Sequence, residues 1–140
     1  MEGWIFWALL AAVFAALTAI FGKIGVTGVS ADYATFIRVV VILAALALLL
    51  TVTGQWQHSR TVPARSWLFL VLSGLATGAS WLCYYRALQL GDAARVAPLD
   101  KLSVVLVALF GAGFLGEKLS AVNWTGVALI AGGAVLVALR

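Results

Sequence analysis

The chain has 140 residues, of which 64% are hydrophobic and 10% are charged, and its formal net charge is +4. A soluble domain of this length has too little interior to hide so much apolar surface, so the composition excludes a soluble globular protein. The positive charge is spread among separate short segments rather than along one basic face, which argues against nucleic-acid binding.

Five continuous apolar segments follow one another along the chain. A helix needs ~20 apolar residues to cross the hydrocarbon core of a bilayer, and it satisfies its own backbone hydrogen bonds there. Strands of a membrane β-barrel would alternate in polarity, which these segments do not. We therefore predict an all-α integral membrane protein, with one transmembrane domain over residues 1–140 and the lipid bilayer as its solvent. The predicted transmembrane helices are residues 4–21, 33–52, 67–90, 96–115 and 122–139.

The first segment follows Met1-Glu2-Gly3 and has no basic region before it. It is also longer than the apolar part of a typical secretory signal, so we expect it to be retained as the first membrane helix. Five spans place the two termini on opposite sides of the membrane. We call the N-terminal side, with the second and fourth connections, side A, and the other side B. Most tryptophans lie at helix ends or in loops on side A, as in an aromatic belt: Trp4, Trp7, Trp56, Trp67 and Trp124.

The second segment contains a charged residue, Arg38. It lies about six residues into the helix from side B, which corresponds to ~9 Å along the helix axis. A charge at the centre of a bilayer costs at least ~3 kcal/mol. Arg38 therefore needs an anionic partner or water at this depth, unless its long side chain extends to the interface.

The third segment carries an aromatic stripe at membrane depth. Trp81, Tyr84 and Tyr85 are three and four residues apart, so they share one face of a helix. Two interpretations stay open at this point. The stripe either packs against a neighbouring helix or forms the wall of a substrate cavity.

The fourth segment places two opposite charges at a depth similar to that of Arg38. Asp100 and Lys101 also enter from side B, and we predict an Arg38–Asp100 pair with Lys101 facing a wet cavity or the interface. Pro98 removes a backbone hydrogen bond just before them and loosens this part of the helix. Broken helices at membrane depth are common at transporter binding sites, although a proline in a first helical turn is also ordinary.

No enzymatic site is visible in the sequence. It has no Ser/His/Asp arrangement, no paired catalytic carboxylates and no phosphate-binding Gly-rich loop, and a single histidine, His58, cannot form a metal site alone. We therefore expect no catalytic residues, no metal and no cofactor. The cations near the helix ends are nearly balanced between the two sides, which permits insertion in both orientations. They are Arg60, Arg65 and Lys118 on side A, and Lys23, Arg86, Arg95 and Arg140 on side B.

Several short motifs follow one another in the C-terminal half. They are Tyr85-Arg86-Ala87-Leu88, Arg95-Val96-Ala97-Pro98-Leu99, Phe114-Leu115-Gly116-Glu117-Lys118-Leu119-Ser120 and the glycines of Trp124–Gly133. With these motifs in this order, the C-terminal half resembles the EamA domain of the drug/metabolite transporter superfamily, and Arg38 is similar to the arginine of that family's second helix. The run from Pro98 to Ser103 resembles a subgroup of short members with one domain.

The resemblance implies a five-helix half-transporter in the inner cell membrane, in which helices one to four line a cavity and the fifth supports them. It implies export of small metabolites, amino-acid-like or amphipathic, by alternating access. Larger members have two inverted domains, so this chain is expected to use a second copy of itself. An antiparallel homodimer would supply the other half, and parallel or heteromeric assembly stays open. The alternative function is a non-transporting membrane subunit or an assembly partner of another membrane complex.

The charges, the aromatic stripe and the proline found within the spans are the candidate site residues of such a transporter. The substrate cavity is expected to include Arg38, Trp81, Tyr84, Tyr85, Pro98, Asp100 and Lys101. A related small multidrug family uses an acidic residue within its first helix, and this chain has none there because Glu2 precedes the span.

Overall fold

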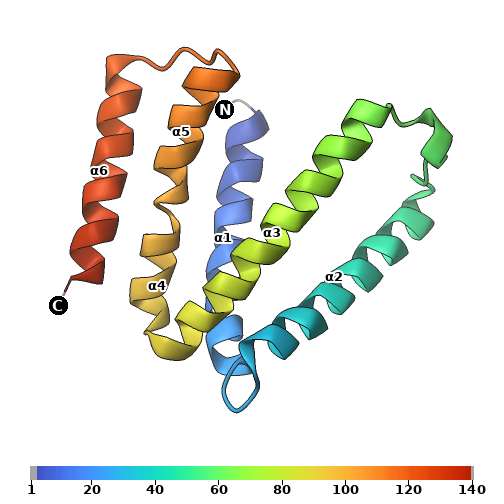
Figure 1. Ribbon diagram of the computed structural model, residues 1–140, viewed down its shortest axis with the longest axis horizontal. Helices are drawn as coiled ribbons and strands as arrows, with labels where there is room; N and C mark the ends of the chain where they lie inside the picture. Colours follow the sequence, from blue (N-terminus) through green and yellow to red (C-terminus); the bar gives the residue numbers. More distant parts are fainter. Residues whose placement is uncertain (1–2, 140) are drawn as a thin grey trace. The chain divides into compact units, whose positions relative to one another are not determined.

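The computed structural model describes residues 3–139, and the regular elements in this range are helices (Figure 1). They are α1 (Gly3–Gly25), α2 (Ala31–Thr53), the 3-10 helix η1 (Ser59–Thr61), α3 (Ala64–Leu90), α4 (Ala93–Asp100), α5 (Ser103–Phe114) and α6 (Ala121–Ala138).

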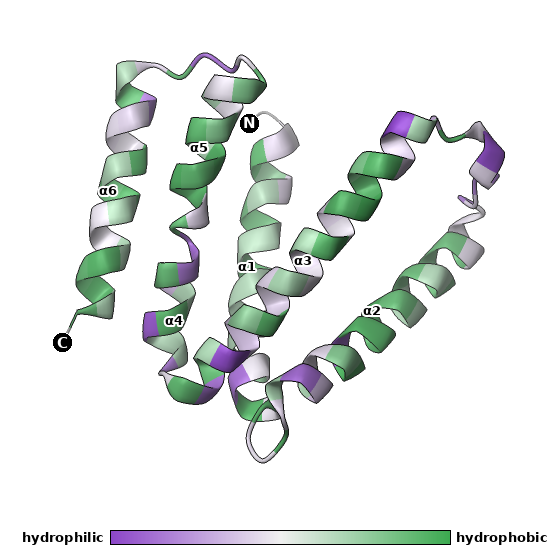
Figure 2. Ribbon diagram, viewed as in Figure 1, coloured by the Kyte–Doolittle hydropathy of each residue, from purple (hydrophilic) through white to green (hydrophobic). Residues whose placement is uncertain are grey.

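Five spans in the described residues are long and apolar enough to cross a membrane, with α4 and α5 together forming the fourth. This confirms the predicted all-α membrane fold. Figure 2 shows hydrophobic residues along α1, α2, α5 and α6, while many of the polar residues lie near helix ends. Large apolar side chains are exposed on every span. This is expected for membrane helices, whose outer surfaces contact lipid or a partner chain.

The first connection is much shorter than the sequence suggested. We predicted a loop between residues 21 and 33, but α1 continues to Gly25 and α2 begins at Ala31. The turn between them uses Gly28, which has a φ of +76° that favours glycine. Ser30 then caps α2, because its side chain accepts a hydrogen bond from the backbone N–H of Tyr33 at 3.3 Å.

The fourth span differs from the predicted continuous helix at residues 96–115. It ends as α4 at Asp100 and resumes as α5 at Ser103. Pro98 lies inside α4 and has no N–H to donate, which weakens the helix at this point. The break is bridged by tighter bonds between residues three apart, such as Leu102 N–H to Leu99 O at 3.1 Å and Val104 N–H to Lys101 O at 3.0 Å.

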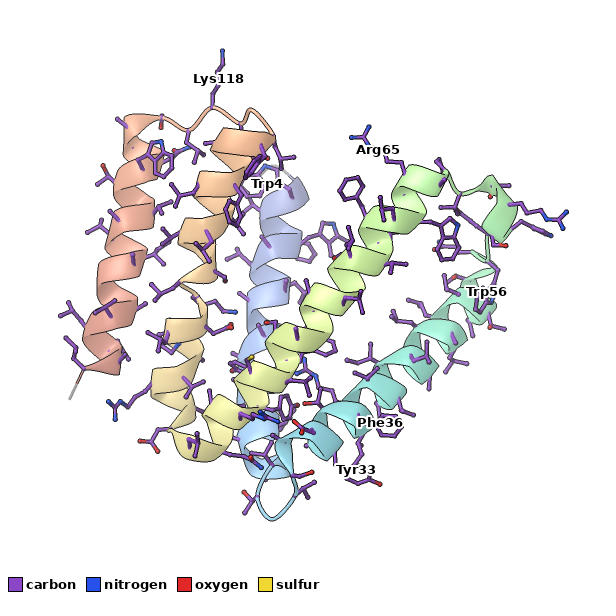
Figure 3. The ribbon with its side chains drawn as sticks, in the orientation of Figure 1. Trp4, Tyr33, Phe36, Trp56, Arg65 and Lys118 are labelled. Atoms are coloured by element: carbon purple, nitrogen blue, oxygen red, sulfur yellow. The ribbon has the colours of Figure 1, made fainter. Side chains whose placement is uncertain are left out.

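The chain divides into two compact units, one formed by the residues up to Phe21 with those from Leu90 onward, and the other by Gly22–Gln89. In the first unit, α6 lies beside α4 and α5 (Figure 1). In the second unit, α2 and α3 contact each other and the last turn of α1. Figure 3 shows Tyr33 and Phe36 on the side of α2 that faces away from α3, where both rings are exposed.

Candidate substrate site

Arg38 lies against the aromatic stripe of α3. Its Cζ atom is 4.2 Å from the ring centroid of Trp81 and 5.5 Å from that of Tyr85. These two rings are one helical turn apart on α3 and therefore present one surface to α2. The contacts are cation–π interactions, which stabilise a positive charge where water is scarce. The structure thus brings together three of the predicted site residues.

The guanidinium of Arg38 is incompletely satisfied. Its Nη1 atom is buried and has no hydrogen-bond partner among the described residues. A buried donor that lacks a partner costs roughly 1–3 kcal/mol, and more when the group is charged. The aromatic rings stabilise the charge, but they do not accept the hydrogen bonds that a guanidinium offers in its own plane.

Tyr85 packs against the end of α1. Only 6% of Tyr85 is exposed, and Leu88, one turn further on, is fully buried. A Cβ atom at Gly22 would lie 3.4 Å from both Tyr85 Oη and Leu88 Cδ1, so α1 and α3 approach closely there. Tyr84 is half-buried and meets Tyr85 edge-to-face, with ring centroids 6.4 Å apart.

Three polar contacts join the last turn of α1 and the connection after it to the end of α3. The Lys23 Nζ donates a hydrogen bond to Leu88 O at 2.6 Å, which places a positive charge at the negative end of the helix. Gln89 Nε2 donates to Val29 O at 2.6 Å and to Val26 O at 3.5 Å. These contacts set the register of α2 against α3, and so the position of Arg38 opposite Trp81. A pocket of about 390 Å³ lies beside them, lined by Lys23, Val26, Thr27, Gly28, Val29, Leu88 and Gln89.

An ion pair between Asp32 and Arg86 also joins α2 to α3. The closest N–O distance is 3.0 Å, and both side chains are more than half exposed. Sequence analysis did not find this pair, although the two opposite charges lie at neighbouring helix ends on side B. Asp32 is the one acidic residue in the sequence from Gly22 to Gln89. The single side-chain carboxylate of the Gly22–Gln89 unit therefore pairs with Arg86 rather than with Arg38.

The other predicted charges lie in the first unit, at the break between α4 and α5. Lys101 Nζ is 3.2 Å from Asp100 Oδ2, so these neighbours pair with each other. The predicted Arg38–Asp100 pair joins residues of different units and stays a prediction, as does the role of Pro98. Elsewhere in this unit, Arg95 Nη2 donates to Ala138 O at 2.6 Å, which places a cation at the end of α6.

A second pocket, of about 830 Å³, lies where α2 and α3 approach η1 on side A. It is lined by Leu50, Gly54, Gln55, Trp56, Gln57, Ser59, Val62, Trp67 and Leu70. Both indole N–H groups bond locally, Trp56 to Thr51 Oγ1 at 3.1 Å and Trp67 to Ser59 O at 3.3 Å. Figure 3 shows Trp56 and Arg65 at this end of the unit, where tryptophan and arginine anchor helices at a membrane interface.

In residues 3–139, no group of three or more acidic, histidine or cysteine residues could hold a metal ion.

The five apolar spans define a multi-pass membrane protein. Over residues 2–139 the chain matches the EamA-like transporter family, and it belongs to that family. It is 65% identical over 137 residues to a Sinorhizobium protein named an uncharacterized transporter in the cobO 3′ region, covering 98% of this chain and 97% of that protein. No solved structure matches the chain.

The family resemblance drawn from the sequence is therefore confirmed, and the chain is a membrane transporter. The assignment indicates that solute movement, rather than catalysis, is the activity of this protein. The roles of the individual site residues remain predictions.

Proposed function

We propose that this chain is a secondary transporter of the inner cell membrane that exports small metabolites, amino-acid-like or amphipathic, by alternating access as a homodimer. The observation that carries this proposal is Arg38, a charge inside a membrane span that contacts Trp81 and Tyr85. Ionisable residues inside spans are expensive, and they mark substrate or ion pathways in membrane proteins.

The interrupted fourth span supports the same proposal. Asp100 and Lys101 lie where α4 ends and the chain turns into α5, next to Pro98. A discontinuous helix exposes backbone groups that bind solutes, and it provides a point where a helix bends as access alternates. Arg38, Asp100 and Lys101 are proposed to recognise charge or to gate, while Trp81, Tyr84 and Tyr85 line the cavity.

The homodimer is supported by the single EamA-like match over residues 2–139 and by the charge pattern. The whole chain, as one transmembrane domain, would form one half of the transporter, and a second copy inserted in the opposite direction would form the other. Inverted repeats around a site near the midplane are a common transporter design. The near balance of cations on the two sides is the property that such dual insertion requires.

Transport by the purified chain is the decisive experiment. The protein is reconstituted alone into liposomes, and exchange of a panel of radiolabelled L-amino acids is measured against empty liposomes. Uptake of at least one solute, lost in Trp81→Ala, supports the proposal and excludes a subunit that needs another protein for transport. Absence of exchange for the whole panel contradicts it. Export is then tested in intact preloaded cells, where overproduction should speed loss of the same solute.

Dual insertion is tested with single cysteines on opposite sides. His58→Cys and Asp92→Cys are introduced separately into a Cys83→Ala background, and intact cells are treated with a membrane-impermeant thiol reagent. Partial labelling at both positions supports the antiparallel homodimer. Complete labelling at one position and none at the other shows a single orientation and overturns the antiparallel assembly.

A further inference from the structure

The unit formed by Gly22–Gln89 has more positive charge than it can neutralise. Its sequence contains five cations and a single anion, Asp32. Lys23 bonds to a helix end and Arg86 pairs with Asp32. Arg60 and Arg65 are exposed near the ends of η1 and α3, where water and lipid headgroups are available. Arg38 is the cation inside a span that has no carboxylate within its own unit.

The contacts of Arg38 with the aromatic rings leave N–H groups of its guanidinium available to donate hydrogen bonds to a ligand. The guanidinium carbon of Arg38 lies over the Trp81 ring, 4.2 Å from its centroid. The N–H groups point outward in the plane, and one of their nitrogens, Nη1, is buried with no partner in residues 3–139. A guanidinium that stacks on a ring and bonds through its edge at the same time is a frequent anion-binding arrangement.

Charge balance narrows the ligand to a monoanion. One guanidinium neutralises one negative charge, whereas a phosphate monoester would bring roughly two negative charges to the same apolar surroundings. A carboxylate carries a single charge and offers two oxygens that match the guanidinium fork. A cationic solute would be repelled, and a neutral one would leave the charge of Arg38 uncompensated.

We propose that Arg38 binds the carboxylate of the transported solute, so that the substrates are solutes with one carboxylate group. This inference rests on the proposed transport function, since it identifies the substrate class of the same site. Trp81 and Tyr85 hold the guanidinium in place, and the adjacent aromatic surface packs against the apolar part of the solute. Binding supplies the missing hydrogen-bond acceptor and removes the net charge inside the membrane.

The test compares each carboxylic acid with its own primary amide, which has nearly the same shape and no negative charge. N-acetyl-L-leucine and N-acetyl-L-phenylalanine, which are monoanions, are paired with N-acetyl-L-leucinamide and N-acetyl-L-phenylalaninamide, which are neutral. Two measurements are made on the purified chain: exchange in liposomes, and the shift in thermal unfolding temperature in lipid nanodiscs. We expect the acids to be exchanged faster than the amides by about tenfold or more, and to stabilise the protein where the amides do not.

Variants assign the preference to Arg38. Arg38→Gln should remove the difference between acid and amide, while Arg38→Lys should retain part of it, because an ammonium keeps the charge but loses the fork. Arg60→Gln, which removes the same charge from an exposed position, is the matched control and should leave the ratio unchanged. The ratio is measured within one preparation, so it does not depend on how much of each variant folds.

The outcomes separate this inference from the transport function. If wild-type protein exchanges acids and amides equally well, or if O-phosphoethanolamine is preferred to both acids, carboxylate recognition is overturned and transport stands. If no solute is exchanged but the acids alone stabilise wild-type protein and not Arg38→Gln, the site stands and transport fails. If neither the acids, the amides nor any other solute of the panel is exchanged, and the acids do not stabilise the protein, both proposals are overturned.

Discussion

Gly22 connects the packing of one residue to the position of the proposed ligand group. A Cβ there would make ordinary van der Waals contact with Tyr85 and Leu88, at 3.4 Å from each. Tyr85 in turn contacts the guanidinium of Arg38. A larger side chain at position 22 would therefore move Tyr85, and with it the surface on which Arg38 rests.

We predict that Gly22→Ala is tolerated and that Gly22→Leu is not. The leucine overfills a closely packed contact, which typically costs about 1–3 kcal/mol. Thermal unfolding of the purified variants measures this cost, and solute exchange in liposomes should fall in parallel. Gly78→Leu is the control, because nothing lies within 4 Å of a Cβ built at Gly78. Equal behaviour of the two leucine variants would contradict the packing role of Gly22.

At the residue scale, the sequence predicted the aromatic stripe but not the partner of Arg38. The spacing of Trp81 and Tyr85 is enough to place both rings on one face of a helix. Which residue lies opposite them depends on the register of α2 against α3. That register depends on contacts such as Gln89 to Val29 O, which join residues far apart in the sequence and follow no local pattern.

At the scale of elements, the predicted spans agree with the helices of the structure to within a few residues at most ends. The exceptions have identifiable causes. The helix α1 extends past Lys23. The ammonium of this residue bonds to the end of α3, so the charge does not need a water-exposed loop. Pro98 cannot donate a backbone hydrogen bond to Ala94 O within α4, and the fourth span divides one turn later, where bonds between residues three apart replace the helical pattern.

The break in the fourth span leads to a prediction for Pro98→Ala. Alanine restores a backbone N–H that can bond to Ala94 O and has the highest helix propensity, so α4 should become more stable by up to ~3 kcal/mol. Hydrogen exchange at the amides of Lys101 and Leu102 should slow as the break tightens. Solute exchange should also slow if this break bends during transport. Unchanged amide exchange would show that the break does not depend on the proline.

The turn from α5 to α6 gives a second prediction at this scale. Gly116 has a φ of +70°, where a residue with a side chain costs ~1–2 kcal/mol, and Glu117 N–H closes the turn on Gly111 O at 3.0 Å. Gly116→Ala should therefore lower the unfolding temperature. Gly113→Ala, in the last turn of α5 with nothing near its Cβ, should leave that temperature unchanged or raise it. A stability loss at position 113 as large as that at position 116 would disprove the backbone explanation.

At the scale of the whole molecule, the exposed surface indicates surroundings that the chain does not supply itself. Exposed large apolar residues occur on all five spans, from Trp4 and Phe14 on α1 to Leu129 and Leu136 on α6. Composition alone predicted lipid as the solvent for this surface. It could not divide the surface between lipid and a second copy, because both contacts are made by the same kinds of apolar side chain.

Orientation is the property of the whole molecule that the charges near the helix ends control. On side A these are Arg60, Arg65 and Lys118. Figure 3 shows Arg65 at the start of α3 and Lys118 on the connection between α5 and α6. On side B, Lys23 and Arg95 each bond to the last turn of a helix. Because the two sets are nearly equal, one or two added lysines should be enough to decide which side remains in the cytoplasm.

We therefore predict opposite effects for lysines added on opposite sides. Gln55→Lys with Gln57→Lys should hold side A in the cytoplasm, and Thr27→Lys with Ser30→Lys should hold side B there. The labelled fractions of the His58→Cys and Asp92→Cys reporters should shift in opposite directions. Each biased variant alone should lose most solute exchange, because it lacks inverted partners, and co-production of the two should restore it. Full exchange by a variant shown to insert in one direction would instead establish a parallel functional assembly.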